Sequence, residues 1–241
     1  MEVHAHAHTA RKRWTHYLWE FIMLFLAVFC GFLAEYQLEH MIERDREESY
    51  VRSYIEDLKT DTAGINRSLK FFQQKMGRMD SLMQLLESGQ LKGHENDLYF
   101  LARTLLRTSG FSSNDRTISQ LKYSGSMRLI RNREAADSMM AYVKLTETET
   151  RHQEDEREER IVAGNIIAKI FDPFVFDKMV SLTSINRPAN NPPLRSYDRD
   201  LQLDLAYCLH QLRGSNFIIQ RRLLQLNLKA TNLIELLEKK Y

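Results

Sequence analysis

Apolar residues follow two kinds of pattern along this chain. The first is an uninterrupted run without a charged residue, Phe21–Ala34, with Trp14 and Tyr36 at its aromatic edges. As an α-helix, residues 14–36 would be roughly 34 Å long. That length matches the hydrocarbon core of a bilayer, which is roughly 30 Å thick. The run therefore predicts a transmembrane helix over residues 14–36.

The second pattern is a stripe in which apolar residues recur at alternating steps of four and three. Its members are Val51, Ile55, Leu58, Thr62, Ile65, Leu69, Phe72, Met76, Met79, Met83 and Leu86, and Thr62 is the one polar member. This spacing is typical of a long helix in a coiled coil or bundle. Residues 37–50 contain no Gly or Pro, so the span could continue into this helix, and Ser88-Gly89 is its expected end.

Further helices are predicted from apolar spacing, N-caps and breakers. They cover residues 97–107, 115–123, 133–171 and the chain from about residue 198. The first three would have Asn96, Asn114 and Asn132 as N-caps, and Pro173 would end the third. Residues 186–197 are rich in Pro and Asn and predict a loop, either a plain surface loop or a partner-binding segment. The stripe of the last helix contains consecutive four-residue steps at Ser215–Ile219–Leu223, a stutter in the heptad pattern.

These elements predict an all-α protein. A single N-terminal transmembrane helix would be followed by an elongated antiparallel helical bundle or coiled-coil domain. The expected organisation is a His-rich and basic tail over residues 1–13, a transmembrane helix over 14–36 and a bundle domain over 37–241. The spacing leaves open whether the heptads pair within one chain or between chains.

Charges around the run predict its orientation. Arg11, Lys12 and Arg13 precede it, and a mainly acidic segment follows it. Lys and Arg near a span favour the cytoplasmic side. We therefore expect a bacterial inner-membrane protein with its N-terminus in the cytoplasm and its main domain in the periplasm. A cleaved signal peptide is one alternative, but Phe32-Leu33-Ala34 has a bulky Phe where a small residue is wanted. A buried helix of a soluble protein is the other.

Composition narrows the function classes. The net charge of +2 is spread over both signs, which gives no electrostatic case for nucleic acid as a partner. The two cysteines cannot form a disulfide scaffold. No Gly-rich phosphate loop, Gly-x-Ser-x-Gly or Cys-x-x-Cys motif occurs. We therefore expect no enzymatic activity, no cofactor and no small-molecule substrate.

Glu20 is the candidate intramembrane acidic site, since ionisable groups inside spans are costly and often functional. Ala27, Gly31 and Ala34 lie within about 40° of Glu20 around the helix and form a candidate association face. In an oligomer the Glu20 carboxyls would gather and share protons or bind a partner's cation. The alternative is that Glu20 lies at the cytoplasmic headgroups beside Arg13 or Lys12.

Two sequence patterns give only a weak indication of a metal site. His4, His6 and His8 alternate in the tail, where imidazoles could bind a transition metal, but a solvated tail is the default interpretation. Glu149 and His152 have the Glu-x-x-His spacing of di-iron bundles, but no second pair exists. The segment 147–160 is charged on all sides, which predicts a solvated helix.

Two segments, Trp14–Glu35 and Gln120–Ile130, resemble a group of single-pass membrane proteins of Bacteroidetes-type bacteria that carry a domain of unknown function. The resemblance implies a membrane-anchored helical domain with a Glu near the start of the span, and Glu20 matches that Glu. It implies no catalytic residue.

The expected function is that of a membrane-anchored helical scaffold or interaction protein that self-associates through its transmembrane helix. The expected partners are the lipid bilayer and either further copies of the chain or another membrane protein. The alternative is a sensory or transport-coupling membrane subunit that uses the intramembrane Glu20.

Overall fold

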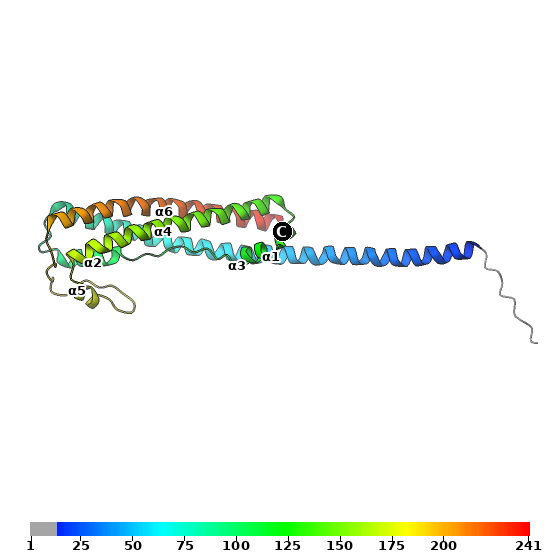
Figure 1. Cartoon of the computed structure of the whole chain (residues 1–241), viewed down its shortest axis with the longest axis horizontal. Helices are drawn as coiled ribbons and strands as arrows, with labels where there is room; N and C mark the ends of the chain where they lie inside the picture. The colour runs from blue at the N-terminus through cyan, green and yellow to red at the C-terminus, as the bar shows by residue number, and fades with distance from the viewer. Residues whose placement is uncertain (1–13) are drawn as a thin grey trace, which may run out of the picture. The chain divides into compact units, whose positions relative to one another are not determined.

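The structure is a computed structural model that describes residues 14–241. Its elements are α1 (Trp14–Ser88), α2 (Glu95–Leu105), α3 (Arg116–Tyr123), the 3-10 helix η1 (Ser126–Leu129), α4 (Arg133–Ile170), α5 (Pro173–Lys178) and α6 (Arg199–Lys240) (Figure 1). The described residues form no β-strand, and their one isolated β-bridge joins Val180 and Ile185. The predicted all-α class is confirmed.

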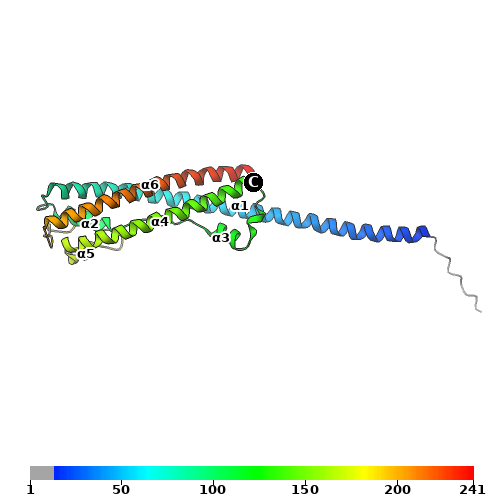
Figure 2. The same ribbon diagram turned by 45° about the horizontal axis from the view of Figure 1, so that its top comes forward.

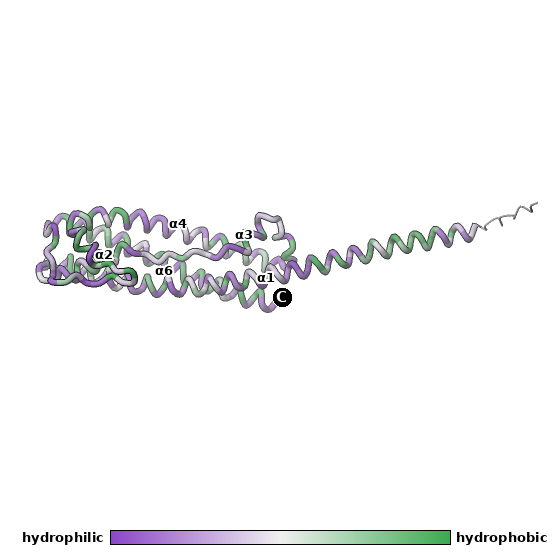
Figure 3. Tube along the Cα trace, turned by 90° about the horizontal axis from the view of Figure 1, so that it is seen from below, coloured by the Kyte–Doolittle hydropathy of each residue, from purple (hydrophilic) through white to green (hydrophobic). Residues whose placement is uncertain are grey.

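The chain divides into two compact units, Met1–Ser49 and Tyr50–Tyr241, and α1 contributes residues to both. The predicted continuity of the apolar helix with the heptad helix is confirmed, because α1 has no break before Ser88. In the first unit the apolar run of α1 stands out by its hydropathy (Figure 3). Its large side chains are exposed, and the helix is long and apolar enough to cross a membrane.

Within the second unit, α4, α6 and the residues of α1 from Tyr50 onward lie side by side in two views (Figures 1 and 2). Contacts between α1 and α4 occur in the same order along both helices. Asp61 accepts a hydrogen bond from Tyr142, and Lys75, further along α1, donates one to Glu156, further along α4. These two helices are therefore parallel. Helix α6 is antiparallel to α4, because Ser215 bonds Glu159 while Lys240 pairs with Glu134. The segment between α1 and α4, which contains α2 and α3, returns the chain from the end of α1 to the level of Asp57 and Asp61. Helices α1 and α4 can therefore run in the same direction.

Two apolar clusters form the interior of the second unit. One joins α1 from Val51 to Phe72 with α3, the first turns of α4 and the C-terminal half of α6. The other joins α1 from Met79 to Leu86 with α2, the end of α4 and the first half of α6. Between Tyr142 and Ala163, α4 contributes no buried apolar side chain to either cluster. Within this long polar gap, α4 buries the carboxyl groups of Glu149 and Glu156.

Several helix ends differ from the sequence prediction. The side chain of Asn132 accepts a hydrogen bond from the Ala135 amide, which confirms it as a cap. Asn96 and Asn114 are not caps, because α2 and α3 begin after His94 and Asp115. Pro173 does end α4, but it also starts α5, where its fixed φ suits the first turn.

The predicted stutter of α6 is wrong. Asn216 is fully buried, whereas Ser215 is only half-buried. The buried stripe therefore keeps alternating steps of four and three, without a stutter, through Leu205, Leu209, Leu212, Asn216, Ile219 and Leu223. The apolar pattern could not show this, because the polar Asn216 takes a core position and its side-chain amide donates to the Leu212 carbonyl.

Candidate functional site

Glu20 has a partner on its own helix. The Nε2 atom of His16 lies 3.2 Å from Oε1 of Glu20, one turn away, and both side chains are about half exposed. Arg13 and Lys12, the neighbours of Glu20 considered from the sequence, lie outside the described residues. His4, His6 and His8 also lie outside them. The contact brings an imidazole and a carboxyl together at the start of the apolar run.

The predicted association face is open in the single chain. Ala27, Gly31 and Ala34 are all exposed on α1. A Cβ atom added at Gly31 would meet no atom within 4 Å. The close approach that Gly31 permits is therefore not used within the chain, and it remains available to another helix.

The structure reveals a row of buried polar residues in the second unit, between α1 and α4. Tyr142 reaches Asp61 and Glu156 reaches Lys75, and both pairs are separated by 81 residues in sequence. By the same offset, Ser68 lies at the level of Glu149. Sequence reasoning missed this row because Asp61, Ser68 and Lys75 lie beside the apolar stripe of α1, seven residues apart, and carry polar side chains that are usually exposed.

At one end of the row, Asp57 and Asp61 hold the segment that leads into α3. Asp57 is 1 % exposed and accepts hydrogen bonds from the Thr117 amide at 2.9 Å and the Asn114 side chain at 2.8 Å. Asp61 accepts from the Ser113 hydroxyl and the Tyr142 hydroxyl at 2.6 and 2.8 Å. Asp57 thus replaces the missing side-chain cap of α3, and Asp61 holds the residues that precede it, so both roles are structural.

Further along the row lies an ion pair. Nζ of Lys75 is 2.6 Å from Oε1 of Glu156, and the side chains are 3 % and 2 % exposed. Nε of Arg160 lies 3.1 Å from the other oxygen of Glu156. Burial lowers the pKa of Lys75, while the Glu156 carboxylate acts in the opposite direction. The geometry favours the charged pair, because each Glu156 oxygen has a cationic partner.

Glu149 is buried between these two clusters and has no such partner. It is 1 % exposed, and neither carboxyl oxygen has a hydrogen-bond partner. Burial raises the pKa of this carboxyl to about 8, and the charge of Arg222 on α6 acts in the opposite direction. The carboxyl is therefore largely protonated at neutral pH.

The prediction that 147–160 forms a solvated helix is wrong for Glu149 and Glu156, which point into the interior. The Glu149-x-x-His152 pair does not converge on a site, since the two residues differ in burial and His152 lies beside Asp155. Among residues 14–241, no three His, Cys, Asp or Glu side chains are grouped as a metal site would need. Cys30 and Cys208 are free thiols, one exposed and one buried.

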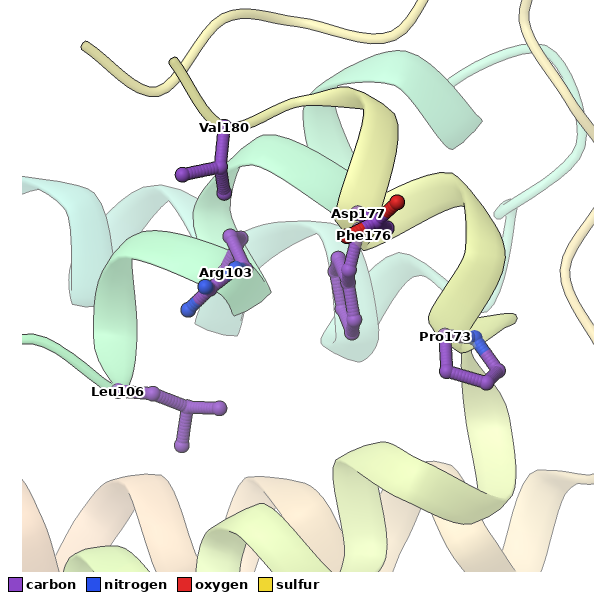
Figure 4. A pocket seen from close by; sticks show the side chains of 6 residues that line it. All are labelled: Arg103, Leu106, Pro173, Phe176, Asp177 and Val180. Atoms are coloured by element: carbon purple, nitrogen blue, oxygen red, sulfur yellow. The ribbon is translucent and has the colours of Figure 1, made fainter. Parts of the chain in front are cut away.

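An open hollow of about 400 Å³ lies between α2 and the segment around α5 (Figure 4). Its lining residues are Arg103, Leu106, Pro173, Phe176, Asp177 and Val180. These side chains include no Ser, Cys or His, so the lining offers neither a hydroxyl or thiol nucleophile nor an imidazole base. Near this end, the predicted loop 186–197 is anchored rather than free. The Asn191 side chain accepts a hydrogen bond from the Asn96 amide at 2.8 Å.

Comparisons with known proteins add no relative of this chain. No family model, no curated protein and no solved structure matches it. The functional interpretation therefore depends on the residues described above.

Proposed function

We propose that this chain is a membrane-anchored helical scaffold or interaction protein that self-associates through its apolar helix. The observation that carries the proposal is the contrast in burial between the two units. Large apolar side chains of α1 from Trp14 to Ile42 are exposed, whereas those of α1 from Val51 onward are packed in cores. A bilayer and a second apolar helix are the surroundings that would cover such a surface.

The proposal places the N-terminus in the cytoplasm and the second unit in the periplasm of a bacterial inner membrane. The basic residues before the run and the acidic residues after it support this orientation. The proposal also assigns no catalysis to the chain. In its support, the buried Asp57, Asp61, Lys75 and Glu156 bond to neighbouring groups of the fold, and none of them lines the hollow beside α5.

The association face can be tested by cysteine crosslinking in native membranes. With the native thiol removed by Cys30→Ser, we expect Ala27→Cys to give covalent dimers on oxidation. Adding Gly31→Leu should lower their yield at least tenfold, because the larger side chain separates the two backbones. The fold should tolerate this change, since the space around Gly31 is empty.

A matched control lies two residues along the same helix. Phe29→Cys, on the opposite side of the helix from Gly31, should give few dimers. Equal crosslinking at both positions would contradict a specific face. Recovery of the protein in the soluble fraction without detergent would contradict the anchor itself.

The contact between His16 and Glu20 favours a second candidate function, a sensory or transport-coupling subunit. A proton-sharing pair at one end of an apolar run has the chemistry that such coupling needs. A pull-down in mild detergent with native mass measurement separates the two functions. Under the scaffold proposal, Glu20→Gln keeps the same partners and copy number. Loss of a partner, with the Ala27→Cys dimers unchanged, would favour the coupling function.

A further inference from the structure

Exposed apolar side chains of α1 continue past the outer aromatic edge of the apolar run, which is Tyr36. Leu38, Met41 and Ile42 are 53 %, 56 % and 42 % exposed and belong to neither core cluster. The residues that surround them, 39–48, are mainly charged. Ile42 lies about 9 Å beyond Tyr36 along the helix axis. A headgroup layer is roughly 5–8 Å thick, so lipid does not account for this apolar surface.

These side chains continue the repeat of the candidate association face. Ala27, Gly31, Ala34, Leu38 and Met41 follow one another at steps of four, three, four and three residues, and all five are exposed. They lie on one uninterrupted helix. Alternating steps of this kind place residues along the seam of a left-handed coiled coil, the hand that most transmembrane helix pairs also have. The association face and the exposed residues beyond it therefore form one seam.

The size of the side chains along this seam changes where the surroundings of the helix change. Its members inside the run are Ala and Gly, which let two backbones approach closely in lipid, where apolar contacts gain nothing over lipid tails. Its members past Tyr36 are Leu38 and Met41, with Ile42 beside them. In water, the burial of large apolar side chains drives association. Each part of the seam thus has the residues that favour pairing in its own surroundings.

We propose that residues 38–42 pair in parallel with the same residues of a second copy of the chain, so that the contact between spans continues outside the membrane as a short coiled coil. This inference rests on the proposed function, because the shared bilayer orients both copies in the same direction and at the same depth. Each seam residue then meets its own counterpart, Leu38 with Leu38 and Met41 with Met41, in an isologous contact. So short a coiled coil is not stable alone, but paired spans raise its effective concentration.

The next position of the repeat ends the contact. It is Asp45, four residues after Met41, and its side chain is exposed. A parallel pair would place two Asp45 carboxylates against each other at the seam, which is unfavourable. The proposed contact therefore lies wholly within the first compact unit, which ends at Ser49.

Cysteine crosslinking in native membranes tests this extension of the seam. In the Cys30→Ser background, we expect Leu38→Cys and Met41→Cys to give covalent dimers on oxidation. The matched control is His40→Cys, which lies between them and on the opposite side of the helix from Leu38. It should give about tenfold less dimer, because a coiled coil brings only seam positions together. The Cys30→Ser parent should give none, since its remaining thiol, Cys208, is buried.

The outcomes separate this inference from the proposed function. Equal yields at Leu38→Cys and His40→Cys would overturn the inference, because chance collisions show no helical periodicity. Absence of dimers at Leu38→Cys and Met41→Cys, with the Ala27→Cys dimers intact, would also overturn it, while association through the span would stand. Absence of dimers at all three positions would overturn both proposals.

A charge in the seam gives a second measurement. In the Ala27→Cys background, Leu38→Glu should lower the dimer yield by about threefold or more, because it places two carboxylates against each other in the continuous seam. Leu38 is half exposed in the single chain, so helix content should not change. The matched control, His40→Glu, adds the same charge on the opposite side of the helix and should leave the yield unchanged. Equal yields for the two variants would contradict the contact.

Discussion

Replacing Lys75 with Met should lower the free energy of unfolding by up to about 3–5 kcal/mol, the usual cost of removing one partner of a buried ion pair. Glu156 is 1 % exposed and would keep only Arg160. The long Met side chain fills nearly the same space as the Lys stem, so the loss would be electrostatic rather than a cavity effect. Guanidinium unfolding of the detergent-solubilised protein, followed by circular dichroism, gives the difference.

Two further variants identify the cause of this loss. The double variant Lys75→Met/Glu156→Met should recover most of the stability, because no buried carboxylate remains and the apolar pair packs well. Lys70→Met, an exposed change on the same helix, should shift the free energy by less than about 0.5 kcal/mol. If the double variant were less stable than the single one, the ion pair would not be the source of the effect.

The second large effect is a pH dependence centred on Glu149. Its pKa is about 8 in the fold and near 4.5 in the unfolded chain, so the folded state holds the proton more tightly. The contribution of the protonated Glu149 carboxyl to the free energy of unfolding is complete below about pH 4.5 and is lost as the pH rises through 8. Between these values, the wild type should lose up to about 1.4 kcal/mol per pH unit relative to Glu149→Gln, which cannot ionise.

We therefore expect the free energy of unfolding of Glu149→Gln to rise relative to that of the wild type from pH 5 to pH 8. Above pH 8 the difference between the two free energies should stay constant. Unfolding curves at matched ionic strength measure it. Glu147→Gln, two residues away and exposed, should follow the wild type at every pH. A constant difference between Glu149→Gln and the wild type from pH 5 to 9 would show that the carboxyl is already ionised in the fold.

Local chemistry made some features predictable from sequence. The cap at Asn132 and the end of α1 at Ser88 depend on neighbouring backbone groups, and both were predicted. The predicted caps at Asn96 and Asn114 are wrong. For α3 the reason is that its Thr117 amide donates to Asp57, which is distant in sequence. Likewise, the heptad rule assigns apolar residues to the core, so it could not place Glu149, Glu156 or Asn216 there.

The all-α class, the apolar run and the continuity of α1 follow from the sequence alone, because apolar periodicity and the length of an apolar run depend on residues that are neighbours in the chain. The burial of particular charges, and the exposure of further apolar side chains on α6, depend on how the helices pack. Whether a polar residue at a core position is tolerated depends on partners supplied by other helices. Lys75 shows this, since its partner Glu156 is reached only when α1 and α4 pack in parallel.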